Sequence, residues 1–296
     1  MISTSVCAAR LILGTAQFGL DYGIGNQAGQ TSLSEATSIL ETAHAHGMRV
    51  LDTAAAYGDS ERRLGAIGLE SWGVISKLPL LPDEVVNIRQ WVKESAEASL
   101  LRLKVPRLHG LLLHRPEQLL GSRGAALYAA LLELKEINLT HRIGISIYDP
   151  GELDQLCKRY RFDIVQCPFN LIDRRLIDSG WLYRLRDLGT ELHVRSVFLQ
   201  GLLLLSPAAR PAKFSRWEDL WSNWQRWLEQ SAMTALQACL NYALSFPEIG
   251  NVVLGVDKKS QLQEIIGIIG LGTPVVPKYL QCTDPRLINP SYWNDL

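Results

Sequence analysis

Three short apolar runs in the chain each lead into a reactive side chain. Residues 48–51 precede Asp52, with Tyr57 five positions further on; residues 72–76 precede Lys77; residues 110–113 precede His114. Runs of this length between helical segments are typical of buried parallel strands. Parallel strands followed by helices direct their C-terminal ends to one face of a sheet or barrel. We therefore expect an Asp, a Tyr, a Lys and a His to meet at one mouth, where they can move a proton.

The chemistry that fits this set is carbonyl reduction. A phenol is a weak acid at neutral pH, and a nearby ammonium stabilises its phenolate, so Lys77 would make Tyr57 a usable general acid. Asp52 can hold Lys77 in place, and His114 can orient a carbonyl oxygen beside the phenol. No side chain can deliver a hydride, so a nicotinamide cofactor is implied. Each residue alone also has a structural interpretation, but four such residues grouped at strand ends favour the catalytic one.

Strand and helix patterns alternate along the whole chain. The expected strands are 10–15, 48–52, 72–77, 110–114, 142–146, 162–166, 192–196 and 251–254. The expected helices include 34–46, 59–67, 83–103, 123–136, 174–188, 231–245 and 260–269, and a further helix begins at Pro150. Eight strand–helix pairs predict an α/β fold, a single-domain (β/α)8 TIM barrel. A doubly wound sheet would carry a G-x-G-x-x-G after an early strand, and none is found there.

Residues 1–296 are expected to form this one domain, with two additions. An insertion at about 205–230 carries four tryptophans at helical spacing, Trp217, Trp221, Trp224 and Trp227. They can pack a helix on the barrel, or form a substrate lid or an oligomer contact. A C-terminal tail covers about 271–296. The substrate pocket is expected to draw on residues 17–22, Tyr148, the insertion and the tail, where Tyr292 and Trp293 either stack on the substrate or, as we favour, only pack the tail down.

Composition excludes several classes of partner. The chain has 30 Lys and Arg residues and 30 Asp and Glu residues, so its formal charge is zero. It therefore lacks the excess of positive charge by which proteins bind nucleic acid or an anionic membrane. The five cysteines, Cys7, Cys157, Cys167, Cys239 and Cys282, form no C-x-x-C pair. We interpret them as reduced thiols of a cytoplasmic protein, and expect no metal site. No signal peptide or membrane span is expected. Oligomeric state stays open.

The motifs around these residues resemble the aldo-keto reductases. The resemblance rests on residues 51–61 (LDTAAAYGDSE), 75–78 (ISKL) and 112–115 (LLHR), with Gly14-Thr15 near the start and 254–264 (LGVDKKSQLQE) near the end. The Asp–Tyr–Lys–His pattern of the family falls on Asp52, Tyr57, Lys77 and His114. The resemblance implies a barrel that binds NADP(H) or NAD(H) without a Rossmann domain and reduces aldehydes or ketones to alcohols. Residues 14–26 are similar to a bacterial branch associated with sugar or surface-polysaccharide metabolism, which implies a carbonyl on a sugar-like metabolite.

The resemblance also implies where a cofactor would lie. Ser146 and Gln166 match contacts to the nicotinamide carboxamide, 195–202 match a loop around the pyrophosphate, and 255–264 match the segment at the adenosine. The implied cofactor residues are Gly14, Thr15, Asp52, Ser146, Gln166, Arg195, Ser196, Phe198, Gln200, Gly201, Leu202, Gly255, Asp257, Lys258, Gln261 and Glu264. Glycine and backbone N–H groups allow close approach to phosphate, and a helix N-terminus suits an anion.

Four positions depart from the family pattern. Ile147 replaces an Asn, Arg195 stands where an aromatic ring stacks on the nicotinamide, Asp257 stands where many relatives have Arg or Ser, and Ile265 replaces an Asn near the adenine. A carboxylate at 257 would repel a 2′-phosphate, although Lys258 and its neighbour could compensate. The resemblance favours NADP(H), with NAD(H) possible.

Two alternative functions, a regulatory subunit and a hydrolase, make different demands on the sequence. The altered Ile147 and Arg195 keep open a nicotinamide-binding regulatory subunit on the same barrel, which predicts a stable protein partner and negligible turnover. A metal-dependent barrel hydrolase would need a His-x-His and carboxylate ligand set that the sequence lacks.

Overall fold

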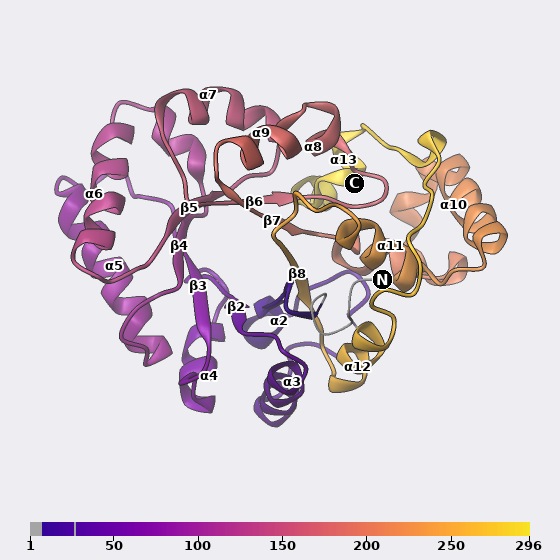
Figure 1. Cartoon of the computed structure of the whole chain (residues 1–296), viewed down its shortest axis with the longest axis horizontal. Helices are drawn as coiled ribbons and strands as arrows, with labels where there is room; N and C mark the ends of the chain where they lie inside the picture. The colour runs from indigo at the N-terminus through magenta and orange to yellow at the C-terminus, as the bar shows by residue number, and fades with distance from the viewer. Residues whose placement is uncertain (1–7, 27) are drawn as a thin grey trace.

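Eight parallel strands close into a barrel at the centre of the molecule (Figure 1). The computed structural model describes residues 8–26 and 28–296; the expected free thiol of Cys7 lies outside them. The strands are β1 (Leu11–Gly14), β2 (Val50–Asp52), β3 (Gly73–Leu78), β4 (Gly110–Leu113), β5 (Ile143–Ser146), β6 (Ile164–Pro168), β7 (Glu191–Arg195) and β8 (Asn251–Gly255). Each pairs with its neighbour in sequence, and β1 pairs with β8 to close the ring. The predicted (β/α)8 barrel is confirmed.

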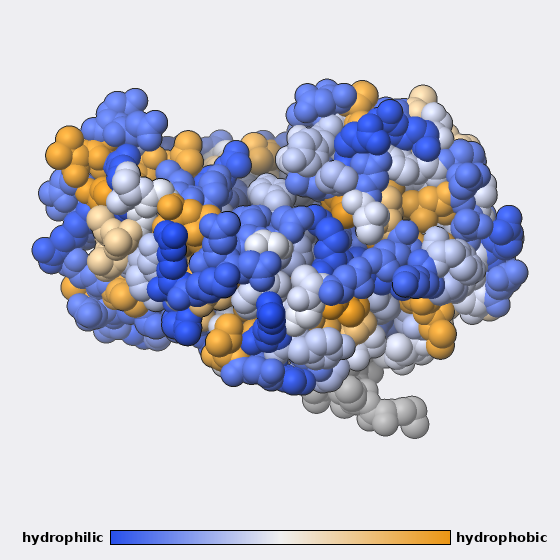
Figure 2. All heavy atoms as spheres, turned by 90° about the horizontal axis from the view of Figure 1, so that it is seen from above, coloured by the Kyte–Doolittle hydropathy of each residue, from blue (hydrophilic) through white to orange (hydrophobic). Residues whose placement is uncertain are grey.

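Helices connect the strands and surround the barrel (Figure 1). They are α2 (Ala16–Gly19), α3 (Leu33–Ala45), α4 (Ser60–Ile67), α5 (Ile88–Leu103), α6 (Gly124–Glu136), α7 (Leu153–Arg159), α8 (Arg175–Asp178), α9 (Trp181–Asp187), α10 (Glu218–Ser231), α11 (Ala235–Leu244), α12 (Lys259–Gly267) and α13 (Pro285–Ile288). No helix in residues 8–26 and 28–296 is long and apolar enough to cross a membrane. On the face shown in Figure 2, hydrophobic residues form separate patches among hydrophilic ones.

Several helices begin or break where the sequence analysis did not expect it. The side chains of Ser32, Asn87 and Thr234 each accept a hydrogen bond from the backbone N–H three residues later, so α3, α5 and α11 start directly after these caps. The predicted starts of these three helices, at residues 34, 83 and 231, were therefore wrong, because the helices begin at residues 33, 88 and 235. The single helix predicted over 174–188 is two helices, because Gly180 has a φ of 75°.

The barrel interior explains why the predicted site residues share one mouth. Ile12, Ile75, Leu112, Ile164 and Val253 pack together inside the barrel. Side chains two residues apart on a strand point to the same side. The next inward positions toward the C-terminal ends are therefore Gly14, Lys77, His114, Gln166 and Gly255. Apolar side chains fill the middle of the barrel, and polar side chains and glycines form the layer above it.

The tryptophan insertion lies at one edge of the molecule, where α10 is drawn in Figure 1. Trp221, Trp224 and Trp227 are buried along one face of α10. The Trp221 indole N–H donates to the carbonyl of Phe214, and the Trp217 indole donates to Asp284 near the C-terminus. The stripe thus packs the insertion against neighbouring segments.

Candidate active site

A buried ion pair lies at the base of the mouth. The Lys77 ammonium donates to Asp52 Oδ1 at 2.6 Å and to the carbonyl of Thr53 at 2.9 Å. Only 1% of the Lys77 side chain is exposed. Burial acts to lower the pKa of Lys77, but interaction with Asp52 and Tyr57 outweighs it, so that this pKa is raised. Lys77 therefore keeps its charge beneath the mouth.

Two aromatic rings stand above this ion pair. The Lys77 ammonium lies 5.0 Å from the centre of the Tyr57 ring. The Tyr57 and His114 rings meet edge to face, with centroids 5.8 Å apart. Both side chains are partly exposed and line the same cavity. The structure thus brings together all four residues that the sequence analysis expected to meet, although 62 positions separate the first from the last.

Two glycines fix the backbone that carries Tyr57. An ideal Cβ on Gly19 would lie 1.8 Å from the Tyr57 carbonyl oxygen and 2.5 Å from the Ser60 nitrogen. Gly58 has a φ of 52°, and a Cβ there would lie 2.3 Å from the Gly19 carbonyl oxygen. The end of α2 therefore meets the turn after Tyr57 backbone to backbone, which only glycine permits at both positions.

The Asp52 carboxylate is also bound from the opposite side of the barrel. The Gln166 amide donates to Asp52 Oδ2 at 2.8 Å, and Ser146 Oγ lies 3.3 Å from Gln166 Oε1. An amide group has two N–H donors, so one remains for another partner. Thr15 binds the backbone of the strand that carries Asp52, because its hydroxyl donates to the Asp52 carbonyl at 3.0 Å. Ser146, Gln166 and Thr15 thus support the ion pair as well as standing where a cofactor is expected.

One cavity of about 810 Å³ runs from the tetrad to the start of α12. Most of the predicted cofactor residues line it, namely Gly14, Thr15, Asp52, Ser146, Arg195, Ser196, Phe198, Gln200, Gly201, Gly255, Asp257, Gln261 and Glu264. Gln166 is buried beneath its floor, Leu202 is buried in the core, and Lys258 is exposed outside its wall. Of the residues predicted for catalysis, Lys77 alone does not line the cavity; it lies below it.

Some lining residues were not expected from the sequence. Thr234, Ala235 and Leu236 line the cavity because α11 starts later than predicted. From the tail, Pro290 and Ser291 contribute, whereas Trp293 packs against Phe214 with ring centroids 5.0 Å apart, which agrees with the interpretation that it packs the tail down. Short tail segments carry no periodic pattern that would have identified these residues.

Tyr22 and Tyr148 bring two further hydroxyls to the mouth. Desolvation and the nearby Tyr57 phenol raise the pKa of Tyr22 to about 12. Tyr22 is therefore a neutral hydrogen-bonding group at physiological pH, poorly suited to give up a proton. Its residue range was expected to contribute to the substrate pocket, and Tyr22 lines this cavity.

The Arg195 guanidinium extends a positive charge into the mouth from the end of β7. It donates to the Ile147 carbonyl at 2.9 Å and lies 4.7 Å above the Tyr148 ring centre. Desolvation, Lys77 and Arg195 together lower the pKa of His114 to about 4. His114 is therefore neutral near pH 7, as a hydrogen-bond donor to a carbonyl oxygen should be.

The segment after β7 closes over the cavity. Ser196, Leu199, Gln200 and Gly201 all have positive φ, between 47° and 91°. The Ile24 N–H donates to the Gln200 carbonyl at 3.0 Å, which joins this segment to the loop after β1. The N–H groups of Leu199 and Gly201 donate to the carbonyls of Ser196 and Phe198, so the opening for a phosphate comes from the missing side chain at Gly201, which lets it approach the backbone closely. The far end of the cavity holds one unsatisfied group, the buried Asp257 Oδ1. These features fit an elongated dinucleotide with polar ends.

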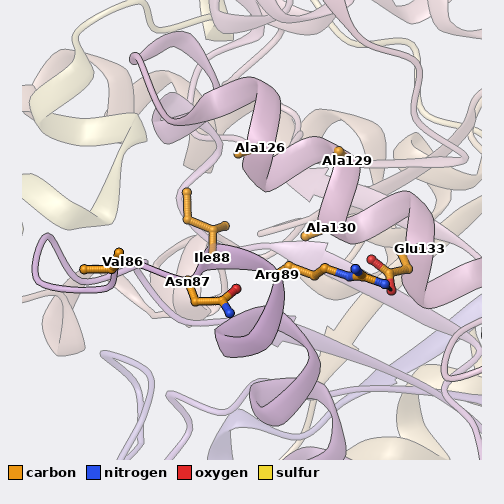
Figure 3. Close-up of a pocket in the computed structure, with 8 residues that line it drawn as sticks. All are labelled: Val86, Asn87, Ile88, Arg89, Ala126, Ala129, Ala130 and Glu133. Atoms are coloured by element: carbon orange, nitrogen blue, oxygen red, sulfur yellow. Dashed lines mark hydrogen bonds and ion pairs between the residues drawn. The ribbon is translucent and has the colours of Figure 1, made fainter.

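A smaller cavity of about 450 Å³ lies between α5 and α6 (Figure 3). Arg89 and Glu133 point toward one another across it and form an ion pair, and the rest of the wall is mainly alanine and aliphatic. This pair neutralises its own charge, so the cavity has no group placed for catalysis. In the part of the chain that the structure describes, no group of three or more His, Cys, Asp or Glu side chains is arranged to hold a metal ion.

Comparison with known proteins decides the family. The sequence model of the Aldo/keto reductase family matches residues 10–273. The chain belongs to the aldo/keto reductase family. This aldo-keto reductase is 26% identical over 276 residues to the uncharacterized oxidoreductase YqkF of Bacillus subtilis, covering 86% of this chain and 89% of that protein. It is 31% identical over 138 residues to an aldo-keto reductase of Mycolicibacterium vanbaalenii, covering 45% of this chain and 48% of the relative.

Solved structures share the same barrel. The holo form of aldo-keto reductase AKR11C1 from Bacillus halodurans superposes with a TM-score of 0.71 at 19% identity, covering 92% of this chain and 89% of that one. A putative aldo-keto reductase from Pseudomonas aeruginosa gives a TM-score of 0.65 at 22% identity, covering 88% and 90% of the two chains. At these identities the likeness establishes the fold. The family is one of oxidoreductases that generally use NAD(P)H.

Proposed function

We propose that this aldo-keto reductase reduces an aldehyde or ketone to an alcohol with a bound nicotinamide dinucleotide, and that Tyr57 is its general acid. The observation that carries the proposal is the grouping of Asp52, Lys77, Tyr57 and His114 at one end of a cavity of about 810 Å³ whose other end reaches Asp257 and Glu264. Hydride transfer needs a reduced nicotinamide, and this group would supply the hydride when bound.

The residues of the mouth account for the proton. As the carbonyl carbon accepts the hydride, its oxygen gains negative charge and takes the proton from the Tyr57 hydroxyl. The phenolate that remains lies close to the Lys77 ammonium, which stabilises it. Asp52 holds this ammonium by a 2.6 Å hydrogen bond, so the charge is placed before the reaction begins.

His114 would orient the carbonyl without competing for the proton. With its pKa lowered to about 4, the imidazole is neutral and can donate one N–H to the carbonyl oxygen beside Tyr57. A neutral donor polarises the C=O bond while leaving proton transfer to the phenol.

The same cavity supports a polar substrate such as a sugar-like carbonyl compound. Tyr22, Tyr148, Asn26 and Gln200 bring hydroxyl and amide groups to its rim, and Arg195 adds a positive charge. Groups of this kind hydrogen-bond hydroxylated molecules and fix their orientation. The cofactor would span from Ser146 and Gln166 to Asp257, Gln261 and Glu264.

The first experiment follows reduction of 4-nitrobenzaldehyde by the loss of absorbance of NADH or NADPH. The purified wild-type chain should turn over, and Tyr57→Phe should lower kcat by about 10²-fold or more while leaving cofactor binding nearly unchanged. Cofactor binding is measured separately by quenching of tryptophan fluorescence. An exposed replacement far from the mouth, Tyr183→Phe, serves as the control and should keep wild-type turnover.

Each outcome has a clear meaning. Turnover that survives Tyr57→Phe would refute the assignment of the acid. Tight cofactor binding with no turnover, even on a panel of polar aldehydes and ketones, would favour the nicotinamide-binding regulatory subunit instead. Failure to bind either nucleotide would refute the proposed function as a whole.

A further inference from the structure

The end of the cavity away from the tetrad carries negative charge. Asp257 and Glu264 are the charged side chains that line it there. The next residue, Lys258, attracts Asp257, but its side chain is exposed and does not form part of the wall. Asp21, in the loop after β1, adds a further negative charge that acts on Asp257. A phosphate on the adenosine ribose, additional to the pyrophosphate, would meet carboxylates at this end.

Three N–H groups at the start of α12 are already bonded to side-chain oxygens and are not available to such a phosphate. A helix N-terminus commonly binds phosphate through its first backbone N–H groups. Here the N–H groups of Asp257 and Lys258 donate to Gln261 Oε1 at 2.7 and 3.2 Å, and the N–H of Lys259 donates to Glu35 Oε1 at 2.6 Å. The side chains of Gln261 and Glu35 thus occupy the positions that a phosphate would take.

One oxygen of the Asp257 carboxylate lacks a hydrogen-bond donor in the described part of the chain. Its Oδ1 is buried and has no partner among residues 8–26 and 28–296. An unpaired buried carboxylate oxygen is costly, and a hydroxyl donor would satisfy it. A ribose diol presents two such donors, whereas 2′-phosphorylation replaces one of them by a group with a charge of about −1.5 to −2 and acceptor oxygens.

We propose that Asp257 makes this reductase select NAD(H) over NADP(H), by accepting a hydrogen bond from the adenosine ribose and repelling a 2′-phosphate. The inference rests on the proposed function, because a nicotinamide held at the tetrad directs the adenosine half of the dinucleotide toward α12. It reverses the NADP(H) expected from the family resemblance. The reason is local: the carboxylates line the cavity, the lysines do not, and the N–H groups of residues 257–259 before and at the start of α12 are already bonded.

The test measures binding without the nicotinamide. Isothermal titration calorimetry compares ADP-ribose with its 2′-phosphorylated form on the wild-type protein. ADP-ribose should bind roughly tenfold tighter or more, as expected for like charges meeting at a partly buried site. Asp257→Asn and Asp257→Ser should lower this ratio by about tenfold, mainly through tighter binding of the phosphorylated form. Asp219→Asn makes the same change of charge at an exposed position on α10 and should leave the ratio unchanged.

The results separate this inference from the proposed function. A wild-type protein that binds the 2′-phosphorylated ligand as tightly as ADP-ribose, or more tightly, would overturn the selection of NAD(H). A ratio unchanged in both Asp257 variants, with folding confirmed by thermal unfolding, would overturn the role of Asp257. If neither ligand binds, and NADH and NADPH do not bind either, both proposals fail together.

Discussion

The Gln166 side chain binds the same carboxylate that holds the Lys77 ammonium. Gln166 Nε2 donates to Asp52 Oδ2 at 2.8 Å, while Asp52 Oδ1 accepts from Lys77 at 2.6 Å. Gln166 lies on β6 and Asp52 on β2, on opposite sides of the closed barrel. Both oxygens of a buried carboxylate are thus paired, and its orientation is set from two directions.

Replacing Gln166 by leucine should loosen this arrangement. The change leaves Asp52 Oδ2 without its donor, which should lower the free energy of unfolding by about 1–3 kcal/mol. Turnover should fall as well, because Asp52 is then free to rotate and Lys77 loses its fixed position. Urea unfolding and steady-state kinetics measure the two effects. Gln230→Leu, at an exposed position at the end of α10, should change stability by less than about 0.5 kcal/mol. Unchanged stability in Gln166→Leu would contradict the pairing.

Substitutions in the Asp52–Lys77 ion pair should affect the free energy of unfolding and the turnover differently. Lys77→Met leaves the buried Asp52 charge uncompensated and should destabilise the fold by about 3–5 kcal/mol. The double variant Asp52→Asn/Lys77→Met removes both charges and should recover much of that stability. It should not recover turnover, because no ammonium remains near Tyr57. Recovery of activity in the double variant would contradict the assigned role of Lys77.

The barrel and the tetrad could be predicted because their signals are local in the sequence. Short apolar runs ending in Asp52, Lys77 and His114 identify parallel strands, and strand parity then places these side chains in one layer. The structure shows this directly, since Lys77 and His114 lie two residues beyond Ile75 and Leu112 of the barrel core.

Other features depend on capping and tail packing, which the sequence pattern does not reveal. The hydroxyl cap of Thr234 moves the start of α11 and brings the first residues of that helix to the cavity. Trp293 packs against Phe214, as the favoured interpretation of the tail aromatics predicts, but the sequence did not identify the smaller Pro290 and Ser291 that lie at the wall. The proposed selection of NAD(H) also depends on which side chains line the cavity. Because Asp257 and Lys258 are adjacent in the sequence, the sequence does not reveal which of the two lines it.

The contact between Gly19 and the Tyr57 turn should be sensitive to a single methyl group. A Cβ at residue 19 would meet the Tyr57 carbonyl oxygen at 1.8 Å, so the turn that carries Tyr57 must move. Gly19→Ala should destabilise the fold by about 1–3 kcal/mol and lower kcat more than it raises KM. Gly267→Ala is a matched control, because a Cβ there has nothing within 4 Å and replaces glycine at the end of α12. That variant should be neutral or slightly more stable. Equal effects of the two substitutions would refute the steric argument.

The lowered pKa of His114 should appear in the pH dependence of stability. The folded protein protonates His114 only near pH 4, whereas the unfolded chain does so near 6.5. Between these values the unfolded state binds more protons, so the free energy of unfolding should increase as pH rises from about 4 to about 6.5 and then level off. His109 and His141 also have lowered pKa values, so His114 must be isolated by comparison with a variant.

His114→Gln provides that comparison, because glutamine keeps an N–H donor but does not titrate. The stability difference between wild type and this variant, measured by urea unfolding, should shift by about 2 kcal/mol in favour of wild type between about pH 4.5 and pH 7.5. Over the same range the wild-type reduction rate should show no inflection from His114, since the imidazole stays neutral. A difference in stability that is constant with pH would mean that His114 titrates alike in the folded and unfolded states, and that neither burial nor Lys77 and Arg195 hold it neutral.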